Sequence, residues 1–180
     1  MRGLVRVIDR INGVTGFVAA WLIVPLILAM CWEVAARYVF NAPTIWAYEL
    51  AYILTGSGWM LGMAYTLSKG AHIRIDVLSG RWSPRRKAAV DIAGYLLLLL
   101  PFLLWVIFAL DNRVIDSFTS GEKSGQSAWN PPIWPFRAVF LASFVCLALQ
   151  VVAEVLRSVA VLLGRDLGRV TEKTLEEGAV

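Results

Sequence analysis

The chain has 180 residues, of which 58% are hydrophobic and 17% charged, whereas soluble domains average about 45–50% apolar and about 25% charged residues. This composition excludes an ordinary soluble domain and predicts an all-α integral membrane protein, built as a single membrane domain over residues 1–180. The net charge of +4 does not indicate nucleic-acid binding, because the basic residues form short clusters between apolar runs and no single patch.

The N-terminal segment, residues 2–14, is expected to form a short amphipathic helix. Its apolar residues recur at helical spacing opposite three arginines. That pattern is typical of a helix that lies flat in the headgroup layer of a membrane. The apolar side consists of Leu4, Val7, Ile8, Ile11 and Val14, and the basic side of Arg2, Arg6 and Arg10.

Four apolar segments follow, each long enough to cross a hydrocarbon core of about 30 Å as a helix that rises about 1.5 Å per residue. They predict transmembrane helices over residues 16–37, 45–67, 89–110 and 134–163. Pro25 and Pro101 fall inside the first and third helices, where they are expected to cause bends and not breaks. Residues 111–134 are too polar to cross and are expected to rest at the membrane surface.

The distribution of Lys and Arg predicts the orientation of the helices. With both termini in the cytoplasm, 13 basic residues lie inside and four lie outside. This asymmetry agrees with the positive-inside rule. The four outside residues are Arg37, Arg113, Lys123 and Arg137.

Few residues of the chain are suited to chemistry. His72 is the single histidine, so the pair of intramembrane histidines that a membrane haem needs is missing. Cys31 and Cys146 lie inside apolar runs and form no Cys-x-x-Cys motif, which argues against a disulfide or a metal site. We therefore expect no catalytic residue, no metal ligand and no cofactor, and the chain is not expected to be an enzyme.

Charged residues near the outer ends of the first two spans have two interpretations each. Glu33 and Arg37 are four residues apart, so they can form a structural ion pair along one helix face. The alternative is an ion or proton site, which the adjacent arginine makes the weaker interpretation. Glu49, at the start of the second span, can interact with the positive end of its helix dipole or bind an arginine of a partner protein.

Two further patterns are candidates for contacts. Gly58 and Gly62 form a Gly-x-x-x-Gly pair in the second span, which predicts close helix packing against either this chain or another subunit. The loop after that span alternates Ile and Val with His72, Arg74 and Asp76. This loop is either an interfacial element with fixed polar contacts or a positively charged anchor.

Three blocks of sequence, in this order and spacing, resemble the small membrane subunit (DctQ-like) of tripartite ATP-independent periplasmic (TRAP) transporters. The segment Trp129–Pro135 before the last span is similar to the same family. One departure is Ala47-Tyr48, where many relatives carry polar residues before the glutamate. The three blocks are Arg37–Pro43 with Trp46 and Glu49, then Gly62–Tyr65, then Gly70–Val77.

The resemblance implies a location in the bacterial inner membrane and a scaffold role in sodium-driven symport. In this family a periplasmic substrate-binding protein delivers an organic acid, and the large membrane subunit moves it by an elevator-like motion. The expected partners are these two proteins and membrane lipids, with no nucleic acid. Charged side chains of the outer loop are candidates for docking the binding protein, namely Asp111, Asp116, Glu122 and Lys123.

Two other functions stay open at the level of sequence. One is a small self-sufficient transporter, acting as a homodimer, which would need an unpaired charge such as Glu33 in its pore. The other is a membrane assembly scaffold that takes no part in transport. Loss of uptake on replacing Glu33 would favour the first, and a stable complex without solute flux would favour the second.

Overall fold

The computed structural model describes residues 2–70 and 83–164, and this part of the chain is helical apart from loops and one isolated β-bridge. The predicted all-α fold class is confirmed. The helical elements are α1 (Arg2–Trp21), α2 (Ile23–Tyr38), α3 (Ala47–Ser68), α5 (Pro84–Gly94), the π-helical turn η1 (Tyr95–Leu99), α6 (Leu100–Thr119) and α7 (Trp134–Leu162).

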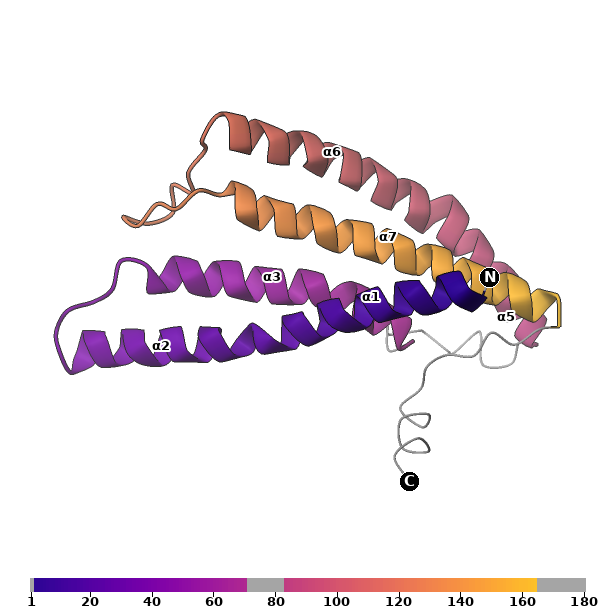
Figure 1. Ribbon diagram of the computed structural model, residues 1–180, viewed down its shortest axis with the longest axis horizontal. Helices are drawn as coiled ribbons and strands as arrows, with labels where there is room; N and C mark the ends of the chain where they lie inside the picture. The colour runs from indigo at the N-terminus through magenta and orange to yellow at the C-terminus, as the bar shows by residue number, and fades with distance from the viewer. Residues whose placement is uncertain (1, 71–82, 165–180) are drawn as a thin grey trace, which may run out of the picture.

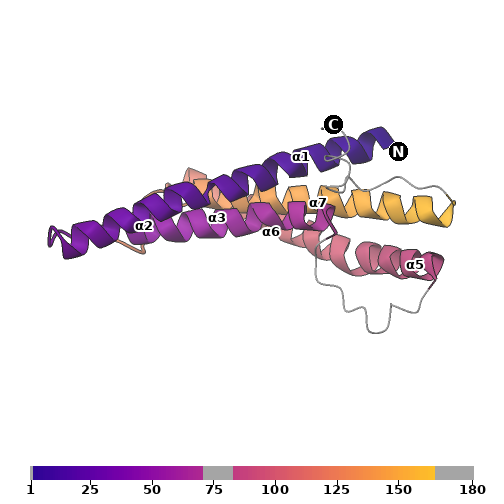
Figure 2. The same ribbon diagram turned by 90° about the horizontal axis from the view of Figure 1, so that it is seen from below.

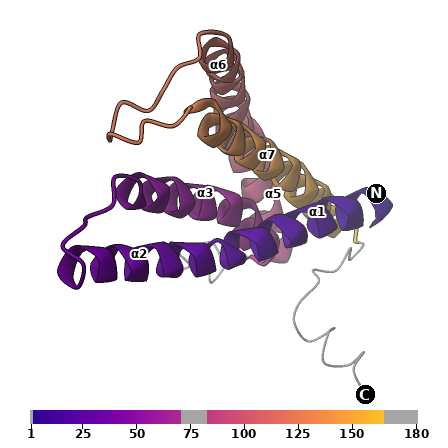
Figure 3. The same cartoon turned by 60° about the vertical axis from the view of Figure 1, so that its left-hand side comes forward.

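The long helices lie side by side in the order α2, α3, α7 and α6 (Figure 1). Among these four helices only neighbours in this order pack extensively, so α3 and α7 occupy the middle of a layer whose edges are α2 and α6, and α1 packs on both α3 and α7. The pair α6 and α7 is inclined against the pair α2 and α3 (Figure 3). The molecule is therefore a bent slab with two wide faces.

Among the described residues, three helical stretches are long and apolar enough to cross a membrane, over residues 2–38, 85–119 and 134–162. The fourth, α3, has 22 residues, or about 33 Å at about 1.5 Å per residue, which matches the hydrocarbon core. It is less apolar than the others because glycine, serine, threonine and tyrosine interrupt its apolar residues. Those small and polar residues suit its position between two helices.

The N-terminal helix differs from the expectation of a separate helix ending at residue 14. It continues to Trp21 and is interrupted from α2 only at Leu22, so the two form one gently curved rod (Figure 2). Pro25 explains the interruption, because it has no N–H to donate to the carbonyl of Trp21. Val5 and Ile8 are buried against Ala153 of α7. Residues 2–14 thus belong to the packed layer.

The helix that contains the third predicted span, residues 89–110, continues beyond it to Thr119. The π-helical turn η1 precedes Pro101, and in it the N–H of Leu100 donates to the carbonyl of Tyr95. A proline ring would clash with the carbonyl four residues earlier in a regular helix, and the wider turn relieves that clash. Pro101 therefore bends the helix without ending it.

The main hydrophobic core lies where α3, α6 and α7 meet. Outside this core, large apolar side chains on α2 and α6 are exposed, as lipid-facing helices require. The core residues are Ala64 and Leu67 of α3, Leu103 of α6, and Leu147, Ala148 and Val151 of α7.

Candidate functional site

Both carboxylate oxygens of Glu33 in α2 accept hydrogen bonds from residues of this chain. One carboxylate oxygen accepts hydrogen bonds from Arg37, including one of 2.9 Å from its Nε. The other accepts from Thr44, whose backbone N–H lies 2.9 Å away and whose hydroxyl also donates. Because both oxygens have donors, the pair fastens the loop after α2 to the helix end and leaves no vacant carboxylate for an ion.

Glu49 lies inside the chain and not on a surface. Glu49 is 1% exposed, and one of its carboxylate oxygens accepts a hydrogen bond from the hydroxyl of Ser127. The other oxygen has no hydrogen-bond partner among the described residues. Glu49 therefore connects the start of α3 to the loop before α7, and an arginine of a partner protein could reach it only if that loop moved.

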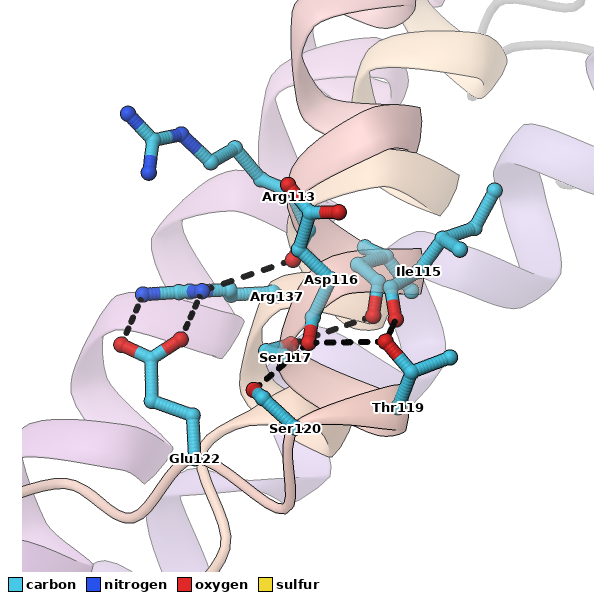
Figure 4. Close-up of polar contacts among 9 residues, drawn as sticks. Arg113, Ile115, Asp116, Ser117, Thr119, Ser120, Glu122 and Arg137 are labelled. Atoms are coloured by element: carbon cyan, nitrogen blue, oxygen red, sulfur yellow. Dashed lines mark hydrogen bonds and ion pairs between the residues drawn. The ribbon is translucent and has the colours of Figure 1, made fainter.

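The loop from Ser120 to Ile133 is ordered by its own hydrogen bonds. Its two sides are joined by backbone hydrogen bonds from the N–H of Ser124 to the carbonyl of Pro131 and from the N–H of Ile133 to the carbonyl of Glu122. Arg137 of α7 holds this loop, since its two terminal nitrogens donate to the two oxygens of Glu122 at 2.6 and 2.8 Å (Figure 4). Two parallel bonds of this kind fix both distance and orientation.

The four docking candidates do not share one role in the structure. Asp111 and Asp116 are exposed on the last turns of α6, while Lys123 is exposed in the loop. The carboxylate of Glu122 is engaged by Arg137, and the side chain of Arg113 points away from this pair (Figure 4). Asp111, Arg113, Asp116 and Lys123 are thus exposed charges at this end that form no ion pair with a described residue, and they are of both signs.

Gly58 and Gly62 line a groove instead of a close crossing of two helices. A Cβ added at Gly58 would meet the carbonyl of Ala19 at 3.6 Å, an ordinary contact. A Cβ added at Gly62 would have no neighbour within 4 Å. The groove, of about 530 Å³, runs between the α1 and α2 rod and α3. The groove beside Gly62 therefore has room for a lipid or for a side chain of another protein.

Two other glycines stand at the tight crossings, and the Gly-x-x-x-Gly pattern did not indicate them. A Cβ on Gly16 of α1 would lie 2.4 Å from Cγ of Tyr65, and one on Gly56 of α3 would lie 2.9 Å from Cζ of Phe136. Phe136 also packs on the rings of Tyr52 and Phe140. These contacts, not the spacing of the glycines, decide which position needs the smallest residue.

We predict that Gly16→Ala destabilises the protein, because the new methyl group meets the Cβ and Cγ of Tyr65 and forces α1 away from α3. Overpacking of this kind costs about 1–3 kcal/mol. Gly13→Ala is the matched control on the same helix, since its Cβ would have no neighbour within 4 Å and alanine favours a helix by up to about 1 kcal/mol. Unfolding in detergent micelles measures both variants, and equal stability would refute the close contact.

A buried polar cluster joins α1 to α7. Asn12 donates to Gln150 over 2.6 Å. Gln150 donates to Asp9 and to Glu154, each over 3.3 Å. Arg157 forms ion pairs with Asp9 and Glu154. Burial of a charge in such a place requires partners of this kind.

The spacing of these residues carried a signal for the cluster. Gln150, Glu154 and Arg157 recur every three or four residues along an otherwise apolar helix. A polar stripe of this kind needs a polar partner on a neighbouring helix. Asp9 and Asn12, three residues apart on the first helix, form the matching stripe.

The loop motif of His72, Arg74 and Asp76 lies outside the described residues. Within residues 2–70 and 83–164, no three side chains of His, Cys, Asp or Glu lie close enough to hold a metal ion. The described residues thus provide internal ion pairs and hydrogen bonds, a wide apolar surface and the groove beside Gly58 and Gly62.

Two comparisons with known proteins agree with the sequence resemblance. The family model of the DctQ component of tripartite ATP-independent periplasmic transporters matches residues 26–161. The sialic acid TRAP transporter small permease protein SiaQ of Vibrio cholerae is 20% identical over 132 residues, which cover 73% of this chain and 76% of that protein. The matched region includes α3, α6 and most of α2 and α7.

Proposed function

The chain belongs to the DctQ component family of tripartite ATP-independent periplasmic (TRAP) transporters, and from this premise we propose that it is the static scaffold of such a transporter. In this proposal the large membrane subunit carries the solute and the driving sodium ions across the membrane. The small subunit enlarges the static scaffold of the complex. The mobile part of the large subunit then moves relative to this scaffold.

The layered arrangement of helices is the observation that supports a scaffold. Both edge helices, α2 and α6, carry exposed apolar residues along their length. A layer with two wide apolar faces can meet lipid on one side and a second membrane protein on the other. Four tryptophans near the end that carries the Ser120–Ile133 loop suit the layer for anchoring at that interface, namely Trp32, Trp46, Trp129 and Trp134.

A self-sufficient transporter has less support. Transport sites near the middle of a membrane are built from broken helices whose ends converge on the solute. In the described part of the chain, the interruptions at Leu22 and at η1 lie on different rods, and helix resumes directly after each of them. Glu33, the carboxylate that a pore would need, is occupied by Arg37 and Thr44.

The loop end of the molecule suits the proposed contact with a periplasmic binding protein. Its exposed charges, Asp111, Asp116 and Lys123, can steer a partner over short distances without contributing much affinity. The loop is held in place by Glu122 and Arg137 and by Glu49 and Ser127. A loop fixed in this way presents its charges in one arrangement. The solute is proposed to be an organic acid, and SiaQ, the relative named above, serves sialic acid by its name.

Isolation of the intact complex tests the proposed assembly. A tag on this chain and purification in a mild detergent should yield a large TRAP-type membrane subunit in a stoichiometric complex, identified by mass spectrometry. We expect one wide face of the layer to contact lipid and the other to contact the large subunit, so this chain should be purified together with that subunit. Purification of this chain as the single protein, in a stable homodimer, would refute the scaffold assignment.

The proposed orientation places both termini in the cytoplasm and the Ser120–Ile133 loop in the periplasm, in agreement with the 13 to 4 distribution of basic residues. Single cysteines can be placed at Ser124 and Arg85 in a chain with Cys31→Ala and Cys146→Ala. An impermeant thiol reagent added to intact spheroplasts should label Ser124→Cys and not Arg85→Cys. The reverse pattern would overturn the orientation.

A further inference from the structure

Two cavities follow one another along the contact between α1 and α3. The deeper one is the apolar groove that contains Gly16, Gly58 and Gly62. The other, of about 320 Å³, lies nearer the chain's N-terminus and contains Arg6, Arg10 and Lys69. Tyr65 lines both, and Gly13 and Gly16 are one helical turn apart, so the two cavities adjoin.

The smaller cavity, which is lined by Arg6, Arg10 and Lys69, is positively charged. Arg6, Arg10 and Lys69 form no ion pair with a described residue. Asp9, which also lines this cavity, does not neutralise them, because its carboxylate is engaged by Arg157 and Gln150 of α7. Three cations therefore face a space that lies at the end of the apolar layer, where lipid headgroups are found.

The deeper groove is apolar and has the length of one leaflet. Its lining runs from Gly16 to Ile23 along α1 and α2, and from Leu54 to Thr66 along α3. At about 1.5 Å per residue these stretches span about 10 and about 18 Å, and half of a hydrocarbon core is about 15 Å. Small residues at Gly58 and Gly62 keep the groove open.

We propose that these two cavities form one binding site for an anionic phospholipid. The headgroup phosphate lies among Arg6, Arg10 and Lys69, and an acyl chain follows the groove past Gly58 and Gly62. A cationic cavity next to an apolar groove matches a molecule with an anionic headgroup and an apolar acyl chain. A free phosphate would use only the cationic cavity, and an apolar partner helix would fill the groove without an anionic group to match Arg6, Arg10 and Lys69.

Native mass spectrometry of the full chain in mild detergent tests the proposal, with phosphatidylglycerol and phosphatidylcholine as the added lipids. We expect one tightly retained phosphatidylglycerol and weaker retention of phosphatidylcholine. Each cation near a headgroup contributes about fivefold to affinity, so removing all three should weaken phosphatidylglycerol binding about a hundredfold. The variant is Arg6→Gln with Arg10→Gln and Lys69→Gln, and Arg113→Gln at the other end is the matched control.

A second variant tests the groove. Gly62→Phe places a ring in the groove, since a Cβ built at Gly62 has no neighbour within 4 Å. It should reduce retention of phosphatidylglycerol while the three cations remain. Photoactivatable acyl chains should crosslink to residues 16–23 and 54–66 in the unchanged protein, which keeps the test valid if the variant folds poorly.

Three results would overturn the proposal. The first is equal retention of both lipids, or equal loss in the triple variant and in Arg113→Gln. The second is displacement of the lipid by excess inorganic phosphate with no effect of Gly62→Phe, which would indicate an anion site alone. The third is loss of the large subunit from Gly62→Phe with unchanged lipid binding, which would assign the groove to a partner helix.

Discussion

Replacement of Arg157 by methionine is expected to lower the free energy of unfolding by about 3–5 kcal/mol, the cost of breaking a buried ion pair by removing one partner. Arg157 is 8% exposed and pairs with Asp9 of α1 and Glu154 of α7. Without it, two largely buried carboxylates face each other across the contact between the helices. Their repulsion would separate α1 from α7.

The controls for Arg157 separate charge from shape. Arg113→Met removes an exposed arginine and should change stability by less than about 0.5 kcal/mol. Arg157→Lys keeps the charge but loses the planar fork, so its loss should be intermediate. Adding Asp9→Asn and Glu154→Gln to Arg157→Met removes the uncompensated charges and should restore most of the stability. Failure of this triple variant to recover would show that the cluster acts by something other than charge balance.

Local contacts could be predicted from the sequence, and contacts between distant segments could not. The pairing of Glu33 with Arg37 follows from a separation of four residues on a helix, and the structure forms it. The second half of that contact, from Thr44, depends on how the loop after α2 folds back. The tight positions Gly16 and Gly56 depend on the rings of Tyr65 and Phe136, which no spacing rule contains.

The ends of helices were the least predictable feature. Residues 111–134 are predicted from the sequence to rest at the membrane surface, but a helix can continue beyond the membrane with charged residues on its surface, and α6 includes Asp111, Arg113 and Asp116. The amphipathic pattern predicts an N-terminal helix that ends at residue 14, although no proline interrupts it before Pro25. Hydropathy indicates which residues lie in the hydrocarbon core of the membrane. Capping residues and proline determine where the helix itself ends.

Uptake into proteoliposomes tests the central claim, that this chain supports transport without carrying solute, most directly. The solute is the one bound by the periplasmic protein of the same complex. Vesicles with this chain alone should accumulate no more solute than protein-free vesicles, because the described residues offer no converging helix ends for a midplane site. Vesicles with both membrane subunits, loaded binding protein and an inward sodium gradient should accumulate it. Sodium-dependent uptake by this chain alone would contradict the account.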